Sequence, residues 1–406
     1  MIKLLHISPS YYPAFRFGGP IQSVHLLNKA LVKKGVKVDV LTTTAGNNKE
    51  SMDAWVHNCI KEDGWCHFDG VRVKYLDFVG YEHYNFSLQM VKEIWKVIDN
   101  YDLVHITAVW NFPVLAGAFI SLIKKKPYII SPRGIFHKEA FTSKSGLIKK
   151  FYFNLFAKHY LQKAAAIHYT SQIEKEESEQ LLKHKNSFVI PNGIQISSIA
   201  ISGKVIAPLT NKNYLLILGR IDRIKGFDLL LPAFANIIKK FNDLILVIAG
   251  DDNSPYAQEV RNMIEDMKIN KNIIFTGQVT GDDKWALYKN ALMFVLPSYS
   301  ENFGMSVVEA MACECPVVIS NKIGIYKEVA DNNAGIIVNT TAESVEEGIL
   351  KLLNDEKLRK TISYNGKAMV EKFYDIDKVA NDMLEVYEKI QQKLFIAQES
   401  IPANRN

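Results

Sequence analysis

Residues 292–320, LMFVLPSYSENFGMSVVEAMACECPVVIS, contain the pattern that decides the fold. The stretch opens on a short apolar run and turns at residues 301–304. It then continues as an apolar segment that predicts a helix from about Met305, and it closes on a second apolar run. Two buried strands joined by a helix predict a parallel pair, because a crossover helix returns the chain in the same direction.

Apolar runs of the same kind recur along the whole chain. In the first half they are IKLLHIS, VKVDVLT, VRVKYL, DLVHITA, PYIIS, AAIHYT and SFVIP, and in the second half YLLILG, LILVIAG, NIIFTG, LMFVLP, PVVIS and GIIVN. Near-continuous apolar strands separated by helices are typical of parallel sheets covered on both faces. The two series predict an α/β protein with two doubly wound, Rossmann-like domains that face each other across a cleft, with ligands at the carboxyl ends of the strands.

The boundary between these domains is expected within residues 192–213, which are polar, contain Gly and Pro, and lack clear periodicity. We therefore predict an N-terminal domain over residues 1–200 and a second domain over residues 201–375. Residues 376–406 predict a C-terminal helix that packs back toward the N-terminal domain, followed by a frayed tail.

The composition bounds the class of function. The 406 residues are 48% hydrophobic and 23% charged with a net charge of +6, which is ordinary for a soluble enzyme. This mild excess suits anionic small molecules or a membrane surface and is too small to indicate nucleic-acid binding. The charge-free stretch between Asp102 and Lys124 is long enough to suggest a membrane span, but it breaks into a strand and a helix and predicts the buried middle of a sheet.

Cysteine usage points to the cytoplasm. Only four cysteines occur, and the N-terminal residues show no secretory signal, so we expect a reducing compartment. The cluster of His57, Cys59, Cys66 and His67 lacks the Cys-x-x-Cys spacing of zinc sites. The sequence therefore predicts no metal site there.

Two loops that follow predicted strands carry groups suited to a phosphate. Gly18 and Gly19, in FGGP, let backbone N–H groups approach a phosphate at a helix N-terminus, although a tight turn explains the pair about as well. Arg220 and Lys225, in LGRIDRIKGFDLLL, lie together in one strand-to-helix loop. Arg can bind a diphosphate bidentately and Lys can bind it as a point charge.

Two carboxylates flank the start of the helix in the opening stretch. Glu301 precedes the helix beside its free amides, and Glu309 lies about five residues into it, roughly 7 Å along the axis. Placed in this way, they could hold sugar hydroxyls on either side of a diphosphate. A purely structural Glu309 would need a buried partner, because an unpaired buried charge is costly.

A fourth loop, SPRGIFHKEA at residues 131–140, follows the predicted strand PYIIS. Arg133 and His137 lie on the first domain's side of the predicted cleft, where either could contact a phosphate or a transferred sugar. A single His is nevertheless more often structural than catalytic.

These motifs together resemble glycosyltransferase family 4, the retaining GT-B transferases of group 1. Glu301 and Glu309, with NFGMSVVEAMA between and around them, resemble the family's E-x7-E motif, and SPRGIF is similar to the branch that acts in bacterial polysaccharide assembly. The resemblance covers nearly the whole chain and includes FGGP, AAAIHYTSQIEKEE, VIPNGI, LGRIDRIKG, FTGQV and PVVIS.

The resemblance implies a role for each group. Arg220 and Lys225 would bind the donor diphosphate, Glu309 the ribose hydroxyls and Glu301 the donor sugar, with Glu301, Arg220, Lys225 and His137 as the catalytic candidates. The other implied donor contacts are Gly18, Gly19, Arg133, Gly277, Gln278, Val279, Asn302, Phe303 and Gly304. The donor would be a nucleotide-sugar, with UDP or GDP favoured, and the enzyme would need neither a cofactor nor a metal.

One departure from the family pattern concerns the end of the motif helix. The family usually has Gly where this chain has Glu314, and a Gly there would fit a left-handed C-terminal cap. Glu314 therefore casts doubt on the cap rather than on the chemistry. The chain also lacks the His-Asp pattern of many members, which leaves His137 as a substitute.

The acceptor implied by the resemblance is a glycan or a lipid-linked oligosaccharide for capsule, O-antigen, lipopolysaccharide or exopolysaccharide. Residues 144–163 alternate lysines with large apolar side chains, and no acidic residue occurs between Glu139 and Glu174. Such a basic amphipathic stretch can lie on anionic lipid, which would make the enzyme peripheral on the inner face of the membrane. It fits equally a helix that packs inward with its lysines in solvent.

Two other classes of function share this architecture. The chain could be a sugar-nucleotide epimerase or a phosphorylase, although no lysine stands out for pyridoxal phosphate. It could also be an inactive sugar-nucleotide-binding subunit, but such a protein would show damaged motif residues, and all four motifs are intact.

Overall fold

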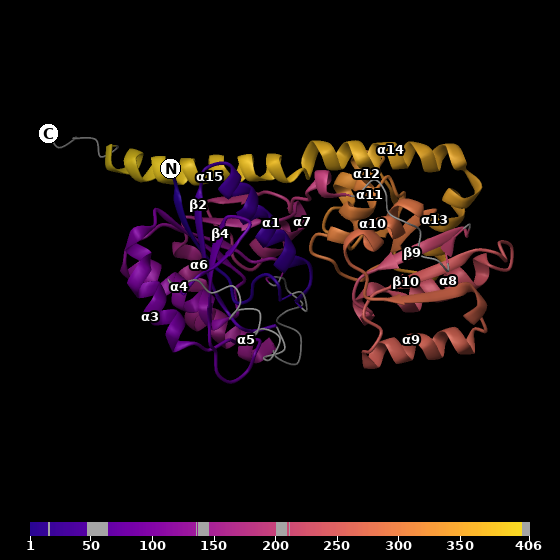
Figure 1. The fold of residues 1–406 in the computed structure, drawn as a ribbon, viewed down its shortest axis with the longest axis horizontal. Coiled ribbons are helices and arrows are strands. Elements are labelled where there is room, and N and C mark those ends of the chain that lie inside the picture. The colour runs from indigo at the N-terminus through magenta and orange to yellow at the C-terminus, as the bar shows by residue number, and fades with distance from the viewer. Residues whose placement is uncertain are drawn as a thin grey trace. The chain divides into compact units, whose positions relative to one another are not determined.

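The computed structural model of the chain describes residues 1–14, 17–46, 64–134, 136, 146–199, 209–210 and 212–399. These residues belong to two compact units (Figure 1). Unit 1 comprises Met1–Gly193 and the C-terminal stretch from Ile376, and unit 2 comprises Ile194–Asp375. Residues 200–208, which include the predicted end of the first domain, lie outside the described part of the chain.

Unit 1 is built on an eight-stranded sheet with the order β3-β4-β2-β1-β5-β6-β7-β8. Neighbouring strands are parallel except β3 and β4, which pair antiparallel. The strands are β1 (Lys3–Ile7), β2 (Lys37–Thr43), β3 (Cys66–Phe68), β4 (Val71–Leu76), β5 (Leu103–Thr107), β6 (Tyr128–Ser131), β7 (Ala166–Tyr169) and β8 (Ser187–Val189). All seven predicted strands form, and in the part of unit 1 that the structure describes the three-residue edge strand β3 is the one addition.

The helices of unit 1 begin where the sequence supplies caps. The hydroxyl groups of Ser87 and Ser171 accept hydrogen bonds from the third amide of the helix that follows each. The helices are α1 (Gly19–Lys33), α3 (Leu88–Val97), α4 (Phe112–Ile123), α5 (Gly146–Tyr152), α6 (Lys158–Lys163), α7 (Gln172–Glu179) and α15 (Ile376–Glu399). The charge-free stretch forms β5 and α4, as predicted. Among the described residues, no helix is both long enough and apolar enough to span a bilayer.

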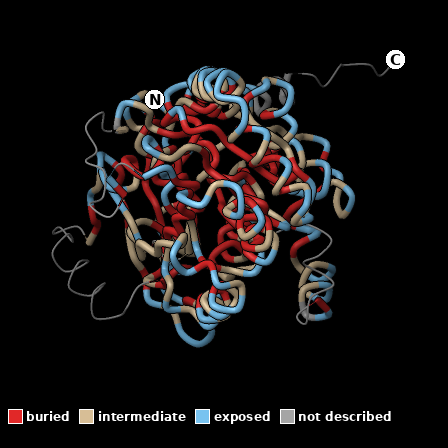
Figure 2. Tube along the Cα trace, turned by 90° about the vertical axis from the view of Figure 1, so that its right-hand side faces the viewer, coloured by how far each residue is buried: buried red, intermediate tan, exposed pale blue. Residues whose placement is uncertain are grey.

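The C-terminal helix α15 is part of unit 1. It packs against α1, and its residues Val379, Ala380 and Met383 are fully buried with α1 and the first strands in one hydrophobic cluster. The hydroxyl group of Tyr387, also on α15, lies 2.7 Å from Nδ1 of His105 on β5. Figure 2 shows buried segments running through the interior and exposed segments around them.

Unit 2 contains a six-stranded parallel sheet with the order β11-β10-β9-β12-β13-β14. The strands are β9 (Tyr214–Leu218), β10 (Ile245–Ala249), β11 (Ile273–Gly277), β12 (Met293–Leu296), β13 (Val317–Ser320) and β14 (Ile336–Val338). The helices are α8 (Phe227–Ile237), α9 (Pro255–Asp266), α10 (Gly281–Asn290), α11 (Met305–Ala312), α12 (Tyr326–Asp331), α13 (Ala342–Asn354) and α14 (Glu356–Phe373). All six predicted strands form. Both units are therefore doubly wound α/β folds, as predicted.

The sequence put a left-handed cap at Glu314 in doubt, but the structure shows that this cap forms. Glu314 adopts a left-handed backbone conformation with φ of 58°. Its amide donates to the carbonyl of Met311 at 3.0 Å, and the amide of Cys315 donates to the carbonyl of Ala310 at 2.9 Å. This pair of hydrogen bonds is a Schellman cap, so the motif helix ends as a Gly would end it. An ion pair of 2.7 Å with Lys367 holds the Glu314 side chain.

Three of the four cysteines lie in the described residues. Cys66 on β3 is disulfide-bonded, whereas Cys313 and Cys315 are free and buried. The reducing compartment that the cysteine count predicts stays a prediction. His57 and Cys59, the other members of the tested cluster, lie outside the described residues. Within the described residues, no group of three His, Cys, Asp or Glu side chains is placed to hold a metal ion.

Candidate functional site

The strand order of unit 2 identifies where a ligand site should lie. Strands β9 and β12 are neighbours, and the chain moves outward in opposite directions from them, to β10 and β11 on one side and to β13 and β14 on the other. In sheets of this kind ligands bind beyond the carboxyl ends of the strands at this switch point. The loop after β9 carries Arg220 and Lys225, and the loop after β12 carries Glu301. The topology therefore brings three of the predicted site residues to one place.

Lys225 is positioned by a tight turn at the end of the loop after β9. The Asp222 carboxylate accepts a hydrogen bond from the Ile224 amide at 3.0 Å, and a 3-10 turn over Arg223–Lys225 follows. Gly226 then adopts a left-handed conformation with φ of 73° and starts α8. A Cβ at Gly226 would lie 2.4 Å from the carbonyl oxygen of Pro297, in the loop after β12. Only glycine therefore lets the two loops come this close.

Lys225 and Glu301 form a charge-assisted hydrogen bond across the switch point. Lys225 Nζ donates to Glu301 Oε2 at 2.5 Å, and both side chains are partly buried. The backbone of Glu301 is fixed on both sides, because its amide donates to the Lys322 carbonyl at 3.0 Å and its carbonyl accepts from the Gly324 amide at 2.8 Å. A cation and a carboxylate are thus held at the mouth of the sheet, where they can bind a phosphate and a hydroxyl group respectively.

Arg220 is placed differently from Lys225. It directly follows Gly219 at the end of β9 and is exposed to solvent. In the part of the chain that the structure describes, no carboxylate pairs with it. Its guanidinium group is therefore available to an anion from solution, and it can bind a phosphate bidentately.

The predicted Asn302, Phe303 and Gly304 form the turn into α11. The Phe303 side chain is buried against Tyr374, with ring centroids 5.5 Å apart, so only its backbone can face a ligand. Gly304 caps α11 with φ of 91°, and a Cβ there would lie 2.8 Å from Ile323. No side chain caps this helix, so its first amides can bind an anion at the positive end of the helix dipole.

Glu309 has the buried partners that a structural role would require. Lys284 Nζ donates to Glu309 Oε1 at 2.8 Å, and the Tyr288 hydroxyl group donates to Oε2 at 3.0 Å. Burial and the neighbouring carboxylate raise the pKa of Tyr288 well above its usual range, so the phenol stays protonated and donates. The sequence did not predict Lys284 or Tyr288. A buried carboxylate requires donors, but nothing in the pattern shows which helix supplies them.

The predicted contact with the base lies further along the same sheet edge. Gly277 ends β11 with φ of 68°, Gln278 is exposed and Val279 is half-buried. The amide of Gly250, after β10, donates to the Gly277 carbonyl at 2.9 Å, and a Cβ at Gly250 would lie 1.9 Å from the carbonyl oxygen of Gly219. Glycine at position 250 thus lets the backbones at the ends of β9 and β10 approach closely.

Unit 1 carries the remaining predicted residues. Gly18 caps α1 with φ of 82°, and Gly19 is the first residue of that helix. Arg133 follows β6 in a left-handed conformation with φ of 58° and donates to the Asn192 side chain. Burial lowers the pKa of Arg133 to about 10, which still leaves it charged at neutral pH. His137 lies outside the described residues. A joint site of these residues with those of unit 2 stays a prediction.

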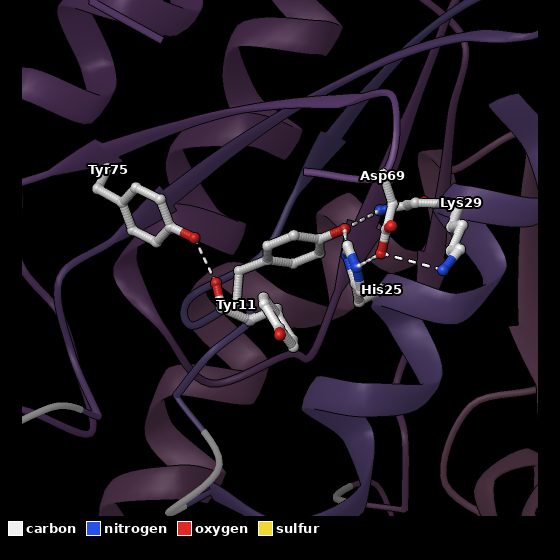
Figure 3. A network of polar contacts seen from close by, with 7 residues as sticks. Tyr11, His25, Lys29, Asp69 and Tyr75 are labelled. Carbon is white, nitrogen blue, oxygen red and sulfur yellow. Dashed lines mark hydrogen bonds and ion pairs between the residues drawn. The ribbon is translucent and has the colours of Figure 1, made fainter. Parts of the chain in front are cut away.

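A polar network anchors the loop that leads from β1 to Gly18. The Tyr11 hydroxyl group lies 3.0 Å from Nδ1 of His25, and Nε2 of His25 lies 3.1 Å from the Asp69 carboxylate, which also pairs with Lys29 at 3.2 Å (Figure 3). The Tyr75 hydroxyl group donates to the backbone of the same loop, at Tyr12. These contacts tie the loop to α1 and to the turn between β3 and β4.

Three histidines on adjacent parts of the first sheet are completely buried, and the sequence did not single them out. His6 on β1 stacks on His105 on β5, with ring centroids 4.8 Å apart. The Ser131 hydroxyl group joins His105 Nε2, at 2.9 Å, to His168 Nδ1, at 2.5 Å. Burial lowers the pKa of His6 to about 4 and that of His168 to about 3, and it lowers the pKa of His105 well below its usual range.

Comparison with known proteins gives matches along most of the chain. Residues 17–198 match the model of Glycosyltransferase Family 4, and residues 202–369 match that of Glycosyl transferases group 1. The capsular polysaccharide biosynthesis glycosyltransferase CapM of Staphylococcus aureus is 29% identical over 54% of this chain and 57% of that protein. An uncharacterized glycosyltransferase of Methanocaldococcus jannaschii is 27% identical over 96% of this chain and 99% of its own.

A solved structure shows the same fold over nearly the whole chain. Anabaena HepE, determined in complex with UDP and glucose, superposes with a TM-score of 0.75 at 19% identity and covers 96% of this chain and 100% of its own. The likeness extends through both doubly wound units.

Proposed function

Because this chain belongs to the group 1 glycosyltransferases of family 4 and has their GT-B fold, we propose that it is a retaining, metal-independent hexosyltransferase with a nucleotide-sugar donor. The acceptor is a glycan or a lipid-linked oligosaccharide, and the product enters capsule, O-antigen or exopolysaccharide. The observation that carries the proposal is the meeting of Arg220, Lys225 and Glu301 at the switch point of unit 2.

The chemistry follows from the charges at this switch point. When the bond from the donor sugar to the diphosphate breaks, negative charge builds on the departing oxygen. Arg220, Lys225 and the open amides of α11 stabilise that charge without a metal. The acceptor oxygen bonds to the sugar on the same face, and its proton passes to the leaving phosphate oxygen. Glu301 binds hydroxyl groups of the donor sugar, and Glu309 binds those of the ribose.

The choice of donor and pathway rests on the relatives. HepE was solved with UDP, which supports a UDP-sugar, and CapM is named for capsular polysaccharide biosynthesis. An epimerase, a phosphorylase or an inactive subunit is not favoured, because both sequence relatives are named glycosyltransferases and the candidate residues of unit 2 are intact.

Melting in the presence of nucleotide-sugars tests the proposed donor site. A panel of UDP-, GDP- and ADP-sugars is added in buffer with EDTA, and one nucleotide class is expected to stabilise the protein by about 2.7 kcal/mol at 100 times its Kd. Arg220→Ala should abolish the shift in melting temperature. Arg223→Ala is the matched control, because Arg223 lies in the same loop but pairs with Glu259 on α9 at 2.5 Å. A full panel without a shift would contradict the proposed function.

The membrane part of the proposal rests on one helical face of unit 1. Residues 146–163 form a helical segment of α5, a π-helical stretch (Phe153–Ala157) and α6. Leu147, Phe151 and Leu155 recur every four residues on one face and are 85%, 69% and 53% exposed. The inward side, with Tyr160 and Leu161, is buried. The helix therefore presents apolar side chains to solvent as well as to the core.

The charges around this face favour an anionic lipid surface. Lys150, Lys158 and Lys163 are exposed on the same segment, and Lys149 is half-exposed. Lys144 lies outside the described residues. An apolar row flanked by cations matches a helix that lies in the interface of a bilayer. Such a contact would bring the enzyme to a lipid-linked acceptor.

Vesicle sedimentation measures this contact. The protein is expected to bind vesicles of mixed phosphatidylglycerol and phosphatidylcholine and to leave pure phosphatidylcholine vesicles unbound. The triple change Leu147→Ser, Phe151→Ser and Leu155→Ser should lower the partition coefficient by about 100-fold, because the inserted apolar area is lost. Leu88→Ser, which changes an exposed leucine on α3 of the same unit, is the control. Equal binding by the triple variant would contradict membrane contact through this face.

A further inference from the structure

The carboxylate of Glu309 is held by two donors from one helix. Lys284 and Tyr288 lie four residues apart on α10, so both side chains reach the same side of that helix. Lys284 binds Oε1 at 2.8 Å and Tyr288 binds Oε2 at 3.0 Å, which fixes the plane of the carboxylate. The ammonium group of Lys284 also lies 4.2 Å from the centroid of the Trp285 ring, which restricts the lysine in turn.

Helix α10 ties this arrangement to the predicted base contact. It begins at Gly281, two residues after Val279, and Gly277 is the last residue of β11. Glu309 lies on α11, whose open N-terminus follows the loop of Glu301. The pair Lys284–Glu309 thus joins the element that follows the base loop to the element that follows the switch-point loop. A nucleoside bound along this edge would lie over the pair.

The carboxylate keeps capacity for a ligand. An ionised carboxylate can accept about four hydrogen bonds, and among the described residues Glu309 accepts one at each oxygen. The pair is not sealed, since the side chains of Lys284 and Glu309 are 13% and 10% exposed. Two adjacent oxygens, each with an open acceptor position, match the two hydroxyl groups of a vicinal diol. A ribose presents such a diol, whereas a 2′-deoxyribose presents a single hydroxyl group.

A purely structural ion pair explains this arrangement less well. Charges at this depth lose hydration, and replacing a buried pair by apolar side chains is often neutral or stabilising. Leu287 on α10 and Val308 on α11 already belong to one hydrophobic cluster. Burying Lys284, Tyr288 and Glu309 together costs free energy, and a ligand bound to the Glu309 carboxylate would offset that cost.

We propose that Lys284 and Tyr288 are positioning residues that orient Glu309 for the ribose diol, so that the site selects ribonucleotide donors over 2′-deoxyribonucleotide donors. The inference rests on the proposed function, because it takes the ligand of this edge to be a nucleotide-sugar. Its consequence is specific. A ligand without the 2′-hydroxyl group leaves one fixed acceptor position unfilled, whereas a loosened Glu309 can turn toward the remaining hydroxyl group.

Calorimetric titration with UDP and with 2′-deoxy-UDP measures this selection. GDP and 2′-deoxy-GDP, or the adenine pair, replace them if the melting panel identifies that nucleotide class. For the unaltered chain the 2′-deoxy form is expected to bind about 10- to 100-fold more weakly, as for one lost hydrogen bond to a charged group. In Lys284→Met and in Tyr288→Phe the ratio should fall to within about threefold of unity. Lys284→Arg should restore most of it.

The controls separate positioning from stability and from the proposed function. Lys289→Met changes an exposed lysine in the last turn of the same helix and should leave the ratio unchanged. Tyr288→Phe removes one oxygen and keeps the ring, so it stays informative if Lys284→Met fails to fold. Variants that bind both nucleotides more weakly at an unchanged ratio would overturn the positioning role while the proposed function stands. An unaltered chain that binds no nucleotide of any class would overturn both.

Discussion

Glu301→Gln is expected to lower kcat/KM for sugar transfer by about 10²- to 10³-fold, the loss typical of one preorganised electrostatic contact in an active site. The substitution keeps the size of the side chain and removes its charge. It therefore weakens the 2.5 Å contact with Lys225 and the hydrogen bonds that the carboxylate would accept from the donor sugar. Steady-state transfer from the donor identified by melting gives the rate, and circular dichroism checks the fold. We expect folding to be preserved, because the backbone of Glu301 is held by Lys322 and Gly324.

The matched control for this substitution is Glu356→Gln, which removes the charge from an exposed Glu–Lys pair on α14. Its activity should stay within about twofold of the unaltered chain, since exposed ion pairs contribute little. Full activity of Glu301→Gln would remove Glu301 from the catalytic machinery. Glu301→Ala should abolish transfer. Transfer by this variant at the rate of the unaltered chain would likewise show that Glu301 has no catalytic role.

Unit 1 is expected to lose stability steeply as the pH falls from 7 to 5. His6, His105 and His168 are neutral in the folded state because burial lowers their pKa values, to about 4 for His6 and about 3 for His168. In the unfolded chain each returns to about 6.5 and takes up a proton. The unfolded state therefore binds more protons below pH 6.5, so stability is retained above that pH and falls as the pH approaches the folded pKa values.

The size of this loss is large for a single domain. His6 and His168 together account for about 4 kcal/mol between pH 7 and pH 5, and His105 adds to the loss in the same direction. Domain stabilities are typically about 5–15 kcal/mol, so a loss of this size brings unit 1 close to unfolding. Hydrogen exchange followed by mass spectrometry, with correction for the intrinsic exchange rate, reports it peptide by peptide.

Unit 2 is an internal control for this effect, because all ten histidines of the chain precede residue 194. Peptides from β9 and β12 should keep their protection at pH 5 while those from β1 and β5 lose it. His168→Gln should reduce the pH dependence of unit 1 by about 1 kcal/mol per pH unit between pH 7 and pH 5, the contribution of one titrating group. Equal loss of protection in both units would contradict the role of the buried histidines.

Most of the fold is predictable because a strand that is buried on both faces is a near-continuous apolar run in the sequence. Of the fourteen strands in the described residues, thirteen are apolar runs in the sequence. The exception, β3, is too short and too polar to stand out, and only its antiparallel pairing with β4 makes it a strand. The sequence did not predict the cap at Glu314, because it shows only that glycine prefers a left-handed backbone conformation and not which distant residues contact this position. The ion pair with Lys367 and the hydrogen bond that the Ser363 hydroxyl group donates to the Glu314 carbonyl are tertiary and offset the strain.

Some residues of the candidate site were also predictable from the sequence, and others were not. Arg220, Lys225 and Glu301 follow strands whose order in a doubly wound sheet places them together, so the sequence was sufficient to group them. Lys284 and Tyr288 could not be found, because their distance to Glu309 depends on how α10 packs on α11. The buried histidines leave a weak signal, since one occurs inside each of the apolar runs LLHIS, LVHIT and AIHYT. Histidine within three buried strands indicates a hydrogen-bonded core.

The path of α15 has a consequence for how the protein is made. Unit 2 is one continuous segment, but the core of unit 1 includes Ile376, Val379, Ala380 and Met383, which leave the ribosome only after all of unit 2. Chains usually complete their N-terminal domain first during synthesis. Here the second half can finish folding while the first half still exposes the face that α15 will cover. Completion of unit 1 thus waits until α15 has been synthesised, and a nascent chain stalled before residue 376 would present an open apolar surface to chaperones.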